Sequence, residues 1–258
     1  MTFTSAFSIQ IRVIRAIFWR NLYNLTGVGF LLSLIEPVFH IALIAAWHFA
    51  TRIQPVFGSS TILFISNGLY PVFVFIQLSS HSHTSVNQNK IGQRFSMETP
   101  LDFVIADCVL RLFAYTLIGF VLFGLEAVFI TPDAIPSDWG AIAQSMLVLA
   151  VLGFGMGAVN AAIAPIFPLW HFIYAPVSRV FMLFSGVLFI TDFKPVFLRD
   201  ILSWNPVLHA VSLFRMGFYP TYPTLVFDPF FMWSCAIGVV VFGLACMEVN
   251  RTRISRPA

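Results

Sequence analysis

The residues of this chain that could do chemistry are charged or polar groups set within long apolar runs. In the run at 101–130, Asp107 and Arg111 stand four residues apart, the spacing at which two side chains of one helix meet. We expect an ion pair that fixes helix packing, and a role in transport is the alternative. Arg179 has no acid within one helical turn. It must therefore pair with another helix, snorkel to a membrane face or line a polar path.

Two further groups of ionisable residues allow alternative interpretations. Glu36 precedes Pro37, which removes a backbone hydrogen bond and bends or restarts a helix, and His40 lies one turn further on. A kinked helix start is favoured there over a proton relay through Glu36 and His40. His81 and His83 could hold a metal only on an extended backbone, and no third ligand is near them. We therefore expect no metal site.

The motifs of two enzyme classes are missing or incomplete. Neither of the two lysines, Lys90 and Lys194, follows a glycine, so neither completes a Walker A loop. We do not expect this chain to bind and hydrolyse ATP by itself in the P-loop manner. At Leu183-Phe184-Ser185-Gly186 only half of the Gly-x-Ser-Gly form of intramembrane serine proteases is present. An intramembrane hydrolase that uses Ser185 and His209 is thus a distant alternative.

The composition indicates a membrane protein. Of the 258 residues, 59% are hydrophobic and 10% charged, against about 25% charged in a typical soluble domain. The net charge of +3 is too weak to indicate nucleic acid as a partner. Three cysteines, Cys108, Cys235 and Cys246, share no short spacing that suits a metal or a disulfide framework.

Six runs are long and apolar enough to cross a bilayer, which requires about 20 residues each. Before them, the stretch 5–24 combines an apolar helix face with a narrow polar stripe that includes Arg12 and Arg15, as in a helix lying at the membrane interface. The alternative is that this stretch is the cytoplasmic start of the first span. We predict an all-α polytopic membrane protein with one transmembrane domain, residues 1–258. The expected spans cover about 30–50, 61–78, 101–130, 140–164, 172–191 and 229–247.

The segments between the spans suggest an orientation. With both termini in the cytoplasm, eight basic residues fall inside and four outside, in agreement with the positive-inside rule. The inner connection 79–100 is polar and rich in amides, and is a candidate docking surface. The outer connection 192–228 holds two apolar pieces, 195–202 and 206–218, which are too short to cross and so are re-entrant or interfacial. In the fourth span, Gly153 and Gly157 have the spacing that permits close helix contact.

Several short motifs follow one another in a specific order. They are Leu34-Ile35-Glu36-Pro37, Asn67-Gly68-Leu69-Tyr70-Pro71-Val72-Phe73, Thr99-Pro100-Leu101-Asp102, Ser185-Gly186-Val187 and Leu202-Ser203-Trp204-Asn205-Pro206-Val207-Leu208-His209. In this order and spacing, the chain resembles the permease subunits of type-2 ABC exporters. It is most similar to the capsular-polysaccharide export permeases of the inner membrane of Gram-negative bacteria.

The resemblance implies a non-enzymatic subunit that moves capsular polysaccharide across the bacterial inner membrane. It implies a homodimer with two separate ATPase subunits, which hold the ATP and Mg²⁺, and a periplasmic export partner; the chain itself needs no cofactor. In the connection 79–100, the implied coupling residues that dock the ATPase are Ser85, Val86, Asn87, Gln88, Asn89, Lys90, Gln93 and Arg94. In and beside the connection 192–228, the implied gate and substrate-path residues are Ser185, Trp204, Asn205, His209, Arg215 and Tyr219.

Two other functions are open at this point. The first is a type-2 exporter of another substrate, such as O-antigen, teichoic acid or a lipophilic small molecule. The second, from a different class, is a secondary transporter driven by protons through Glu36, His40 and Arg179.

Overall fold

The computed structural model of this chain describes residues 3–24, 56–82, 99–167 and 169–251, with single positions at 35, 39, 42 and 46. These residues form helices and connecting turns, and no strand occurs among them, so the all-α class is confirmed. The helices are α1 (Phe3–Asn24), α3 (Thr61–Ser80), α5 (Pro100–Phe129), α6 (Trp139–Ile163), α7 (Trp170–Phe184), α8 (Val196–Leu202), α9 (Pro206–Phe218) and α10 (Pro229–Val249). Two short 3₁₀ turns, η2 (Pro132–Ala134) and η3 (Thr191–Phe193), connect them.

Four of these helices, α3, α5, α6 and α10, are long and apolar enough to cross a membrane. Polar caps mark where they begin: the side chains of Ser60, Asp138 and Asp228 accept hydrogen bonds from the first turns of α3, α6 and α10. α7 is a shorter apolar helix. Apart from the single positions named above, the first expected span, 30–50, lies outside the described residues, as does most of the inner connection 79–100.

The region expected as a fifth span at 172–191 is helical only as far as Phe184. The chain turns there because Gly186 adopts a φ of 72°, in the left-handed region that favours glycine. α7 therefore has 15 residues, about 22 Å of rise at 1.5 Å per residue.

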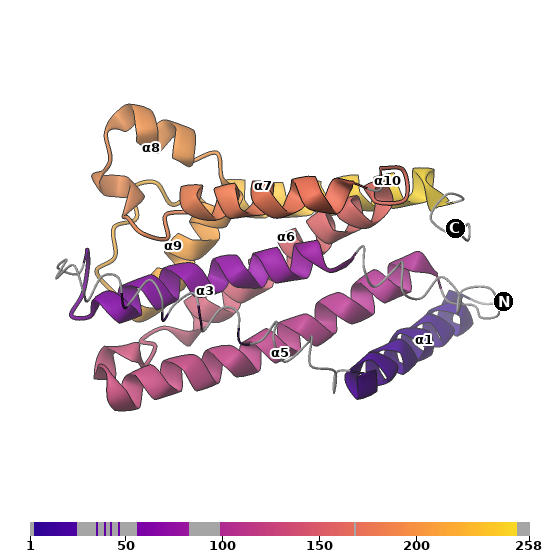
Figure 1. Cartoon of the computed structure of the whole chain (residues 1–258), viewed down its shortest axis with the longest axis horizontal. Coiled ribbons are helices and arrows are strands. Elements are labelled where there is room, and N and C mark those ends of the chain that lie inside the picture. Colours follow the sequence, from indigo (N-terminus) through magenta and orange to yellow (C-terminus); the bar gives the residue numbers. More distant parts are fainter. Residues whose placement is uncertain are drawn as a thin grey trace.

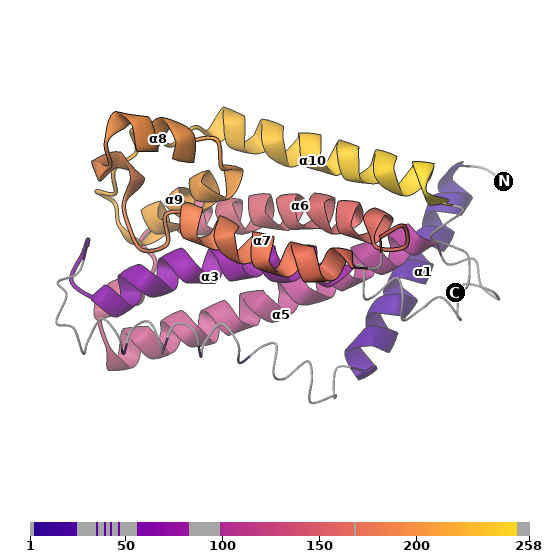
Figure 2. The ribbon, with the colours of Figure 1, turned by 45° about the horizontal axis from the view of Figure 1, so that its top comes forward.

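The long helices run side by side along the molecule (Figures 1 and 2). One end, here called the proximal end, holds α1, the end of α3, the start of α5, the α6–α7 connection and the end of α10. The opposite, distal end holds the segments 56–60 and 130–138 and the α7–α10 connection with α8 and α9. α1 lies across the start of α5, where Ile17 is buried beside Phe103 and Val104.

α6 is the central helix, in contact with α3, α5, α9 and α10. Glycines of α6 permit close contact on two faces of the helix, one toward α3 and one toward α10. A Cβ on Gly153 would lie 2.6 Å from the Leu78 side chain of α3, and one on Gly157 would lie 2.3 Å from Ser82 Oγ. A Cβ on Gly155 would lie 2.7 Å from the backbone of α10. The close helix contact predicted from Gly153 and Gly157 is therefore confirmed.

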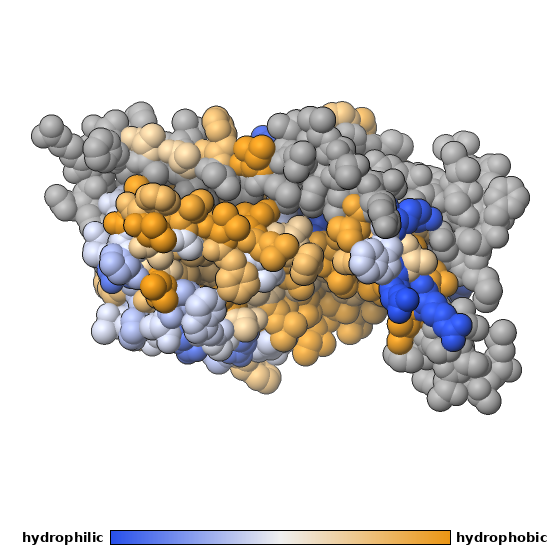
Figure 3. Space-filling model, turned by 90° about the horizontal axis from the view of Figure 1, so that it is seen from below, coloured by the Kyte–Doolittle hydropathy of each residue, from blue (hydrophilic) through white to orange (hydrophobic). Residues whose placement is uncertain are grey.

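The outer surface of the bundle is apolar between its ends. Large apolar side chains of α5, α7 and α10 are exposed, Val121 at 62% and Phe242 at 61% among them. Seen from the α5 side, apolar side chains gather over the middle of the face and hydrophilic ones toward its two ends (Figure 3). This pattern suits a molecule that meets hydrocarbon at its middle and water at its poles.

Candidate functional site

The expected gate and substrate-path residues gather at the distal end, around α9. Asn205 and Pro206 start this helix: the Asn205 side chain accepts a hydrogen bond from the Val207 backbone N–H at 3.0 Å, and Pro206 takes the first helical position. The Asn205 side-chain amide also donates to Ser185 Oγ at 3.0 Å. One residue thus caps α9 and ties it to the end of α7.

Arg215 is the most heavily bonded side chain of this region, and only 1% of it is exposed. Its guanidinium donates to the backbone carbonyls of Val187 at 2.6 Å, Gly186 at 2.7 Å, Phe64 at 3.2 Å and Phe189 at 3.3 Å. The Asn67 side chain and the Tyr222 hydroxyl also accept from it, and its charge lies 3.9 Å from the centre of the Phe64 ring.

The acceptors of Arg215 come from three parts of the chain, namely α3, the turn after α7 and the segment after α9. Its guanidinium forms no ion pair with any carboxylate that the structure describes. In this conformation the N–H groups of the Arg215 guanidinium all donate to acceptors of the chain itself. Arg215 therefore positions the turn at 186–189 against α3 and α9.

His209 joins three elements at the distal end. Its Nε2–H donates to the Ser203 carbonyl at 2.7 Å, and its Nδ1 accepts from the Asp228 backbone N–H at 3.1 Å. These contacts require the neutral ring. Burial lowers the pKa of His209 from its usual 6.5, opposed by the bond to Ser203 and the charge of Asp228.

This geometry argues against the hydrolase alternative. Ser185 Oγ donates to the Phe181 carbonyl at 2.7 Å and accepts from Asn205, whereas both nitrogens of His209 are bonded to backbone groups. Ser185 and His209 therefore do not form a nucleophile and base pair.

Trp204 and Tyr219 occupy different settings. Trp204 is 77% exposed, packs edge-on against Phe231 at 6.2 Å and borders a polar cavity of about 680 Å³. Tyr219 is buried, and its ring packs against Phe57 at 5.3 Å. Burial raises the pKa of Tyr219 to about 12, although the Arg215 charge acts to lower it.

A buried acid that the sequence analysis did not single out lies beside this region. Glu126 of α5 accepts a hydrogen bond from Ser66 of α3. Its second oxygen, Asn67 Nδ2 and Tyr219 Oη are buried and have no hydrogen-bond partner among the residues that the structure describes. The signal for it in the sequence is the occurrence of an acid near the end of the apolar run 101–130.

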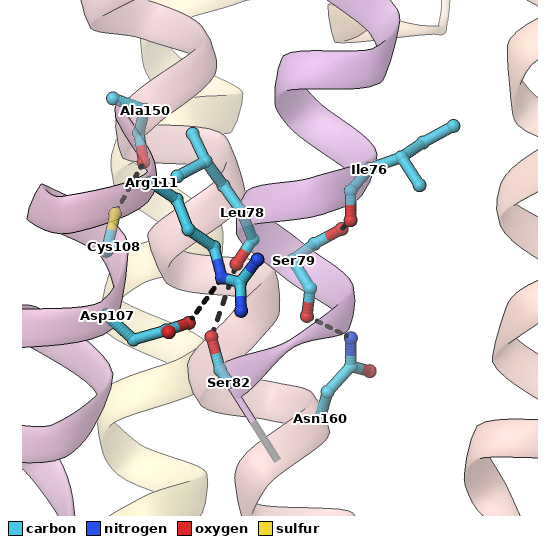
Figure 4. A network of polar contacts seen from close by, with 9 residues as sticks. All are labelled: Ile76, Leu78, Ser79, Ser82, Asp107, Cys108, Arg111, Ala150 and Asn160. Atoms are coloured by element: carbon cyan, nitrogen blue, oxygen red, sulfur yellow. Dashed lines mark hydrogen bonds and ion pairs between the residues drawn. The ribbon is translucent and has the colours of Figure 1, made fainter. Parts of the chain in front are cut away.

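At the proximal end, a second polar network surrounds the last turn of α3 (Figure 4). Asn160 of α6 donates to the Ser79 carbonyl at 2.9 Å and accepts from Trp170 Nε1 at 2.9 Å. Tyr174 of α7 donates to Ser79 Oγ at 2.7 Å. The end of α3, just before residues 83–98, is therefore bound to both α6 and α7.

The predicted Asp107–Arg111 ion pair is confirmed, with Arg111 Nε 3.0 Å from Asp107 Oδ2. Figure 4 draws this pair of α5 together with the side chains at the end of α3. Arg179 is exposed on α7, where the described part of the chain offers it no hydrogen bond or ion pair.

Other predicted residues cannot be placed. Glu36, His40 and all of the expected coupling residues from Ser85 to Arg94 lie outside the described residues, as does His83. Within the described ranges, no three His, Cys, Asp or Glu side chains are grouped so as to hold a metal.

The chain is similar over nearly its whole length to named inner-membrane proteins. It is 25% identical over 248 residues to the capsule polysaccharide export inner-membrane protein CtrC of Neisseria meningitidis, which covers 95% of this chain and 93% of the relative. It is 24% identical to the polysialic acid transport protein KpsM of Escherichia coli, over 84% of this chain and 85% of the relative. The BexB capsule export protein of Haemophilus influenzae is 25% identical, over 84% and 83%.

These relatives agree with the class indicated by the fold, which is a helical protein with four helices long and apolar enough to cross a membrane. No family profile matches the chain. Its homologues are capsule polysaccharide export inner-membrane proteins, so the resemblance predicted from the sequence motifs is confirmed.

Proposed function

We propose that this chain is the transmembrane permease subunit of an ATP-driven exporter that moves capsular polysaccharide across the bacterial inner membrane. The observation that carries the proposal is its similarity over 95% of its length to a capsule polysaccharide export inner-membrane protein. The four helices long enough to cross a membrane support it. The exported polymer passes between two copies of the chain.

The proximal end faces the cytoplasm in this proposal. The described residues nearest both termini lie there, as do the ends of α3 and α5 that flank residues 83–98. The excess of basic residues in the segments assigned to this end supports the same orientation.

The connection 79–100 docks a separate ATPase, through the residues from Ser85 to Arg94. The hydrogen bonds of Asn160 support this proposal because they link the end of α3 to α6 and α7. A displacement of the docked connection would then move these helices together. Such coupling requires packed elements that move as units.

The distal elements α8 and α9 form the outer gate, which dips into the membrane from the outside. The bonds of Asn205 and Arg215 support a closed gate, because they fasten α9 to the end of α7 and to α3. Opening requires these contacts to separate or to move as one body. Trp204 meets sugar rings at the exit in this proposal, and its exposure beside the polar cavity supports that role.

Purification of the tagged chain from its native membrane tests the assembly. We expect a P-loop ATPase to accompany it in a two-to-two ratio, and glycan uptake into inverted vesicles to require ATP. A protonophore that stops transport while ATP remains available would instead indicate the proton-driven alternative. Full transport by the chain alone, in vesicles without any ATPase, would refute the proposal.

The coupling step has its own test in Asn160→Ala, with Thr116→Val as the matched control. Thr116 Oγ1 donates only within its own helix, to the Leu112 carbonyl at 2.7 Å. We expect Asn160→Ala to retain the ATPase and its hydrolysis but to lose most of the export, and Thr116→Val to keep both. Export at the normal rate in Asn160→Ala would exclude this route of coupling.

A further inference from the structure

Two neighbouring cavities lie near the distal end of the bundle. The first is an apolar groove of about 510 Å³ between α5 and α6. The second is a pocket of about 490 Å³ beneath the segment 132–137. Ile135 and Phe218 line both, so the two cavities are adjacent.

The groove offers almost nothing to a polar ligand. Leu112, Phe120, Phe123, Ile142, Met146 and Leu147 contribute to its walls. Two hydroxyls line it, and both are already used: Tyr70 donates to the Tyr115 carbonyl at 2.6 Å and Thr116 to the Leu112 carbonyl at 2.7 Å. Its volume lies within the range of about 300–1,000 Å³ that is usual for ligand sites.

The location of the groove restricts its occupant. It lies along two helices that can cross a membrane, and Trp139, stacked on Phe120 at 6.0 Å, stands where α6 begins. Tryptophan is typical of the level of the lipid headgroups. Because the groove lies along two helices that can cross a membrane and its two hydroxyls are already bonded, a hydrocarbon chain fits it better than water does.

The lining of the adjoining pocket combines apolar side chains with polar ones, and it includes the carboxylate of Asp133. Asp133 lines it together with Ser137, Tyr219 and Thr221. The Asp133 side chain is exposed and accepts a hydrogen bond from Ser59. The segments 56–60, 130–138 and 219–228 contain no Lys or Arg, so Asp133 is not neutralised by a neighbour in these segments. The pocket therefore favours a cationic headgroup over a purely anionic one.

We propose that the two cavities form a single phospholipid site of the outer leaflet. One acyl chain lies in the groove between α5 and α6, and the ammonium of a phosphatidylethanolamine headgroup lies at Asp133. Phe214 and Phe218 of α9 form part of the groove, so the bound chain supports the helix that carries Arg215. This inference goes beyond the proposed export function and does not depend on the exported substrate.

Filling the groove tests the acyl-chain site. A Cβ added to Gly124, which lines the groove, meets no atom within 4 Å, and the same holds for Gly238 on α10 outside it. Gly124→Phe and Gly238→Phe are therefore matched variants. The full chain is purified in detergent from membranes that contain phosphatidylethanolamine and phosphatidylglycerol, and the retained lipid is measured by mass spectrometry.

We expect Gly124→Phe to retain roughly tenfold less phosphatidylethanolamine, the change that follows from displacing about two methylenes. Gly238→Phe should retain as much as the unmodified chain. Should Gly124→Phe fail to fold, Ala143→Phe fills the same groove from α6. Equal retention by the groove-filling and control variants would overturn the proposal.

The role of Asp133 in headgroup binding is tested by the variant Asp133→Asn. The control variant is Asp200→Asn, because Asp200 is an exposed acid of α8 that lines neither cavity. We expect only Asp133→Asn to abolish the preference for phosphatidylethanolamine over phosphatidylglycerol. An unchanged preference would show that Asp133 does not select the headgroup. Disulfide cross-linking of two chains through Gly124→Cys, with no lipid retained, would mean that a second copy covers the groove instead.

Discussion

At the scale of single residues, Arg215 shows how a buried charge is accommodated without a carboxylate partner. Six hydrogen bonds to neutral acceptors replace the water that the guanidinium loses on burial. Its planar fork of five N–H groups suits acceptors in several directions, which a lysine ammonium with three donors cannot match.

Arg215→Lys should therefore destabilise the protein although it keeps the charge. At least three acceptors lose their donor, and we expect a loss of about 2–3 kcal/mol in the free energy of unfolding. Thermal unfolding of the detergent-purified chain measures it. Arg199→Lys on α8, where the arginine is partly exposed, is the control and should unfold like the unmodified chain. Equal melting temperatures for both variants would show that the carbonyl contacts of Arg215 are dispensable.

His209 leads to a pH dependence with a definite sign. Its folded-state pKa lies below the unfolded value of 6.5, so the unfolded chain binds the proton more readily. The contribution of the neutral ring to stability is thus complete above pH 6.5. It declines as the pH falls from 6.5 through the folded-state pKa, by at most about 1.4 kcal/mol per pH unit. The Asp228 carboxylate opposes this effect, and the partly exposed Arg199 and the exposed Asp200 line the same cavity.

Melting temperatures recorded between pH 7.5 and 5 test this dependence. The unmodified chain should lose stability on acidification more steeply than His209→Gln, which has no proton to bind. If the melting temperatures of the two proteins fell in parallel, protonation of the His209 ring would not weaken the hydrogen bond from the Asp228 backbone N–H to His209 Nδ1.

At the scale of the elements, the contact of α6 with α10 depends on two glycines that face each other. A Cβ on Gly155 would meet the Val240 backbone nitrogen at 2.7 Å, and one on Gly243 would meet the Gly155 carbonyl oxygen at 2.4 Å. Backbone atoms cannot move aside as a flexible side chain can. Gly155→Val must therefore separate the helices.

We expect Gly155→Val to cost about 1–3 kcal/mol, the usual range for overpacking. The measurement is the fraction of monodisperse protein in size-exclusion chromatography after heating. Gly238→Val, on the open face of α10, carries the same change in chain entropy without the clash and should behave like the unmodified protein. A normal elution profile for Gly155→Val would show that α6 and α10 need no close contact.

Apolar runs bounded by polar caps made the long helices predictable. The expected runs 61–78 and 140–164 fall on α3 and α6 to within two residues at each end. The end of α7 was not predictable, because the apolar run continues past Phe184 while the turn depends on the φ of Gly186. The hydrogen-bond partners of Arg215 could not be predicted from the sequence either, because most of them are backbone carbonyls, which every residue possesses.

At the scale of the whole molecule, the two ends differ in the segments they hold, and this difference allows the proposed orientation to be tested. Thr221 lies in the distal segment after α9 and Arg251 lies at the proximal end, after α10, and both are exposed. The native cysteines Cys108, Cys235 and Cys246 are free and can be replaced by serine to give a background without thiols.

In that background, a membrane-impermeant maleimide added to spheroplasts should label Thr221→Cys directly. Arg251→Cys should be labelled only after the membrane is permeabilised, because the positive-inside rule places the basic C-terminal residues in the cytoplasm. If both cysteines were labelled in intact spheroplasts, Thr221 and Arg251 would lie on the same side of the membrane, and α10 would not cross it. The reverse pattern would place the distal elements α8 and α9 in the cytoplasm, where they could not form an outer gate.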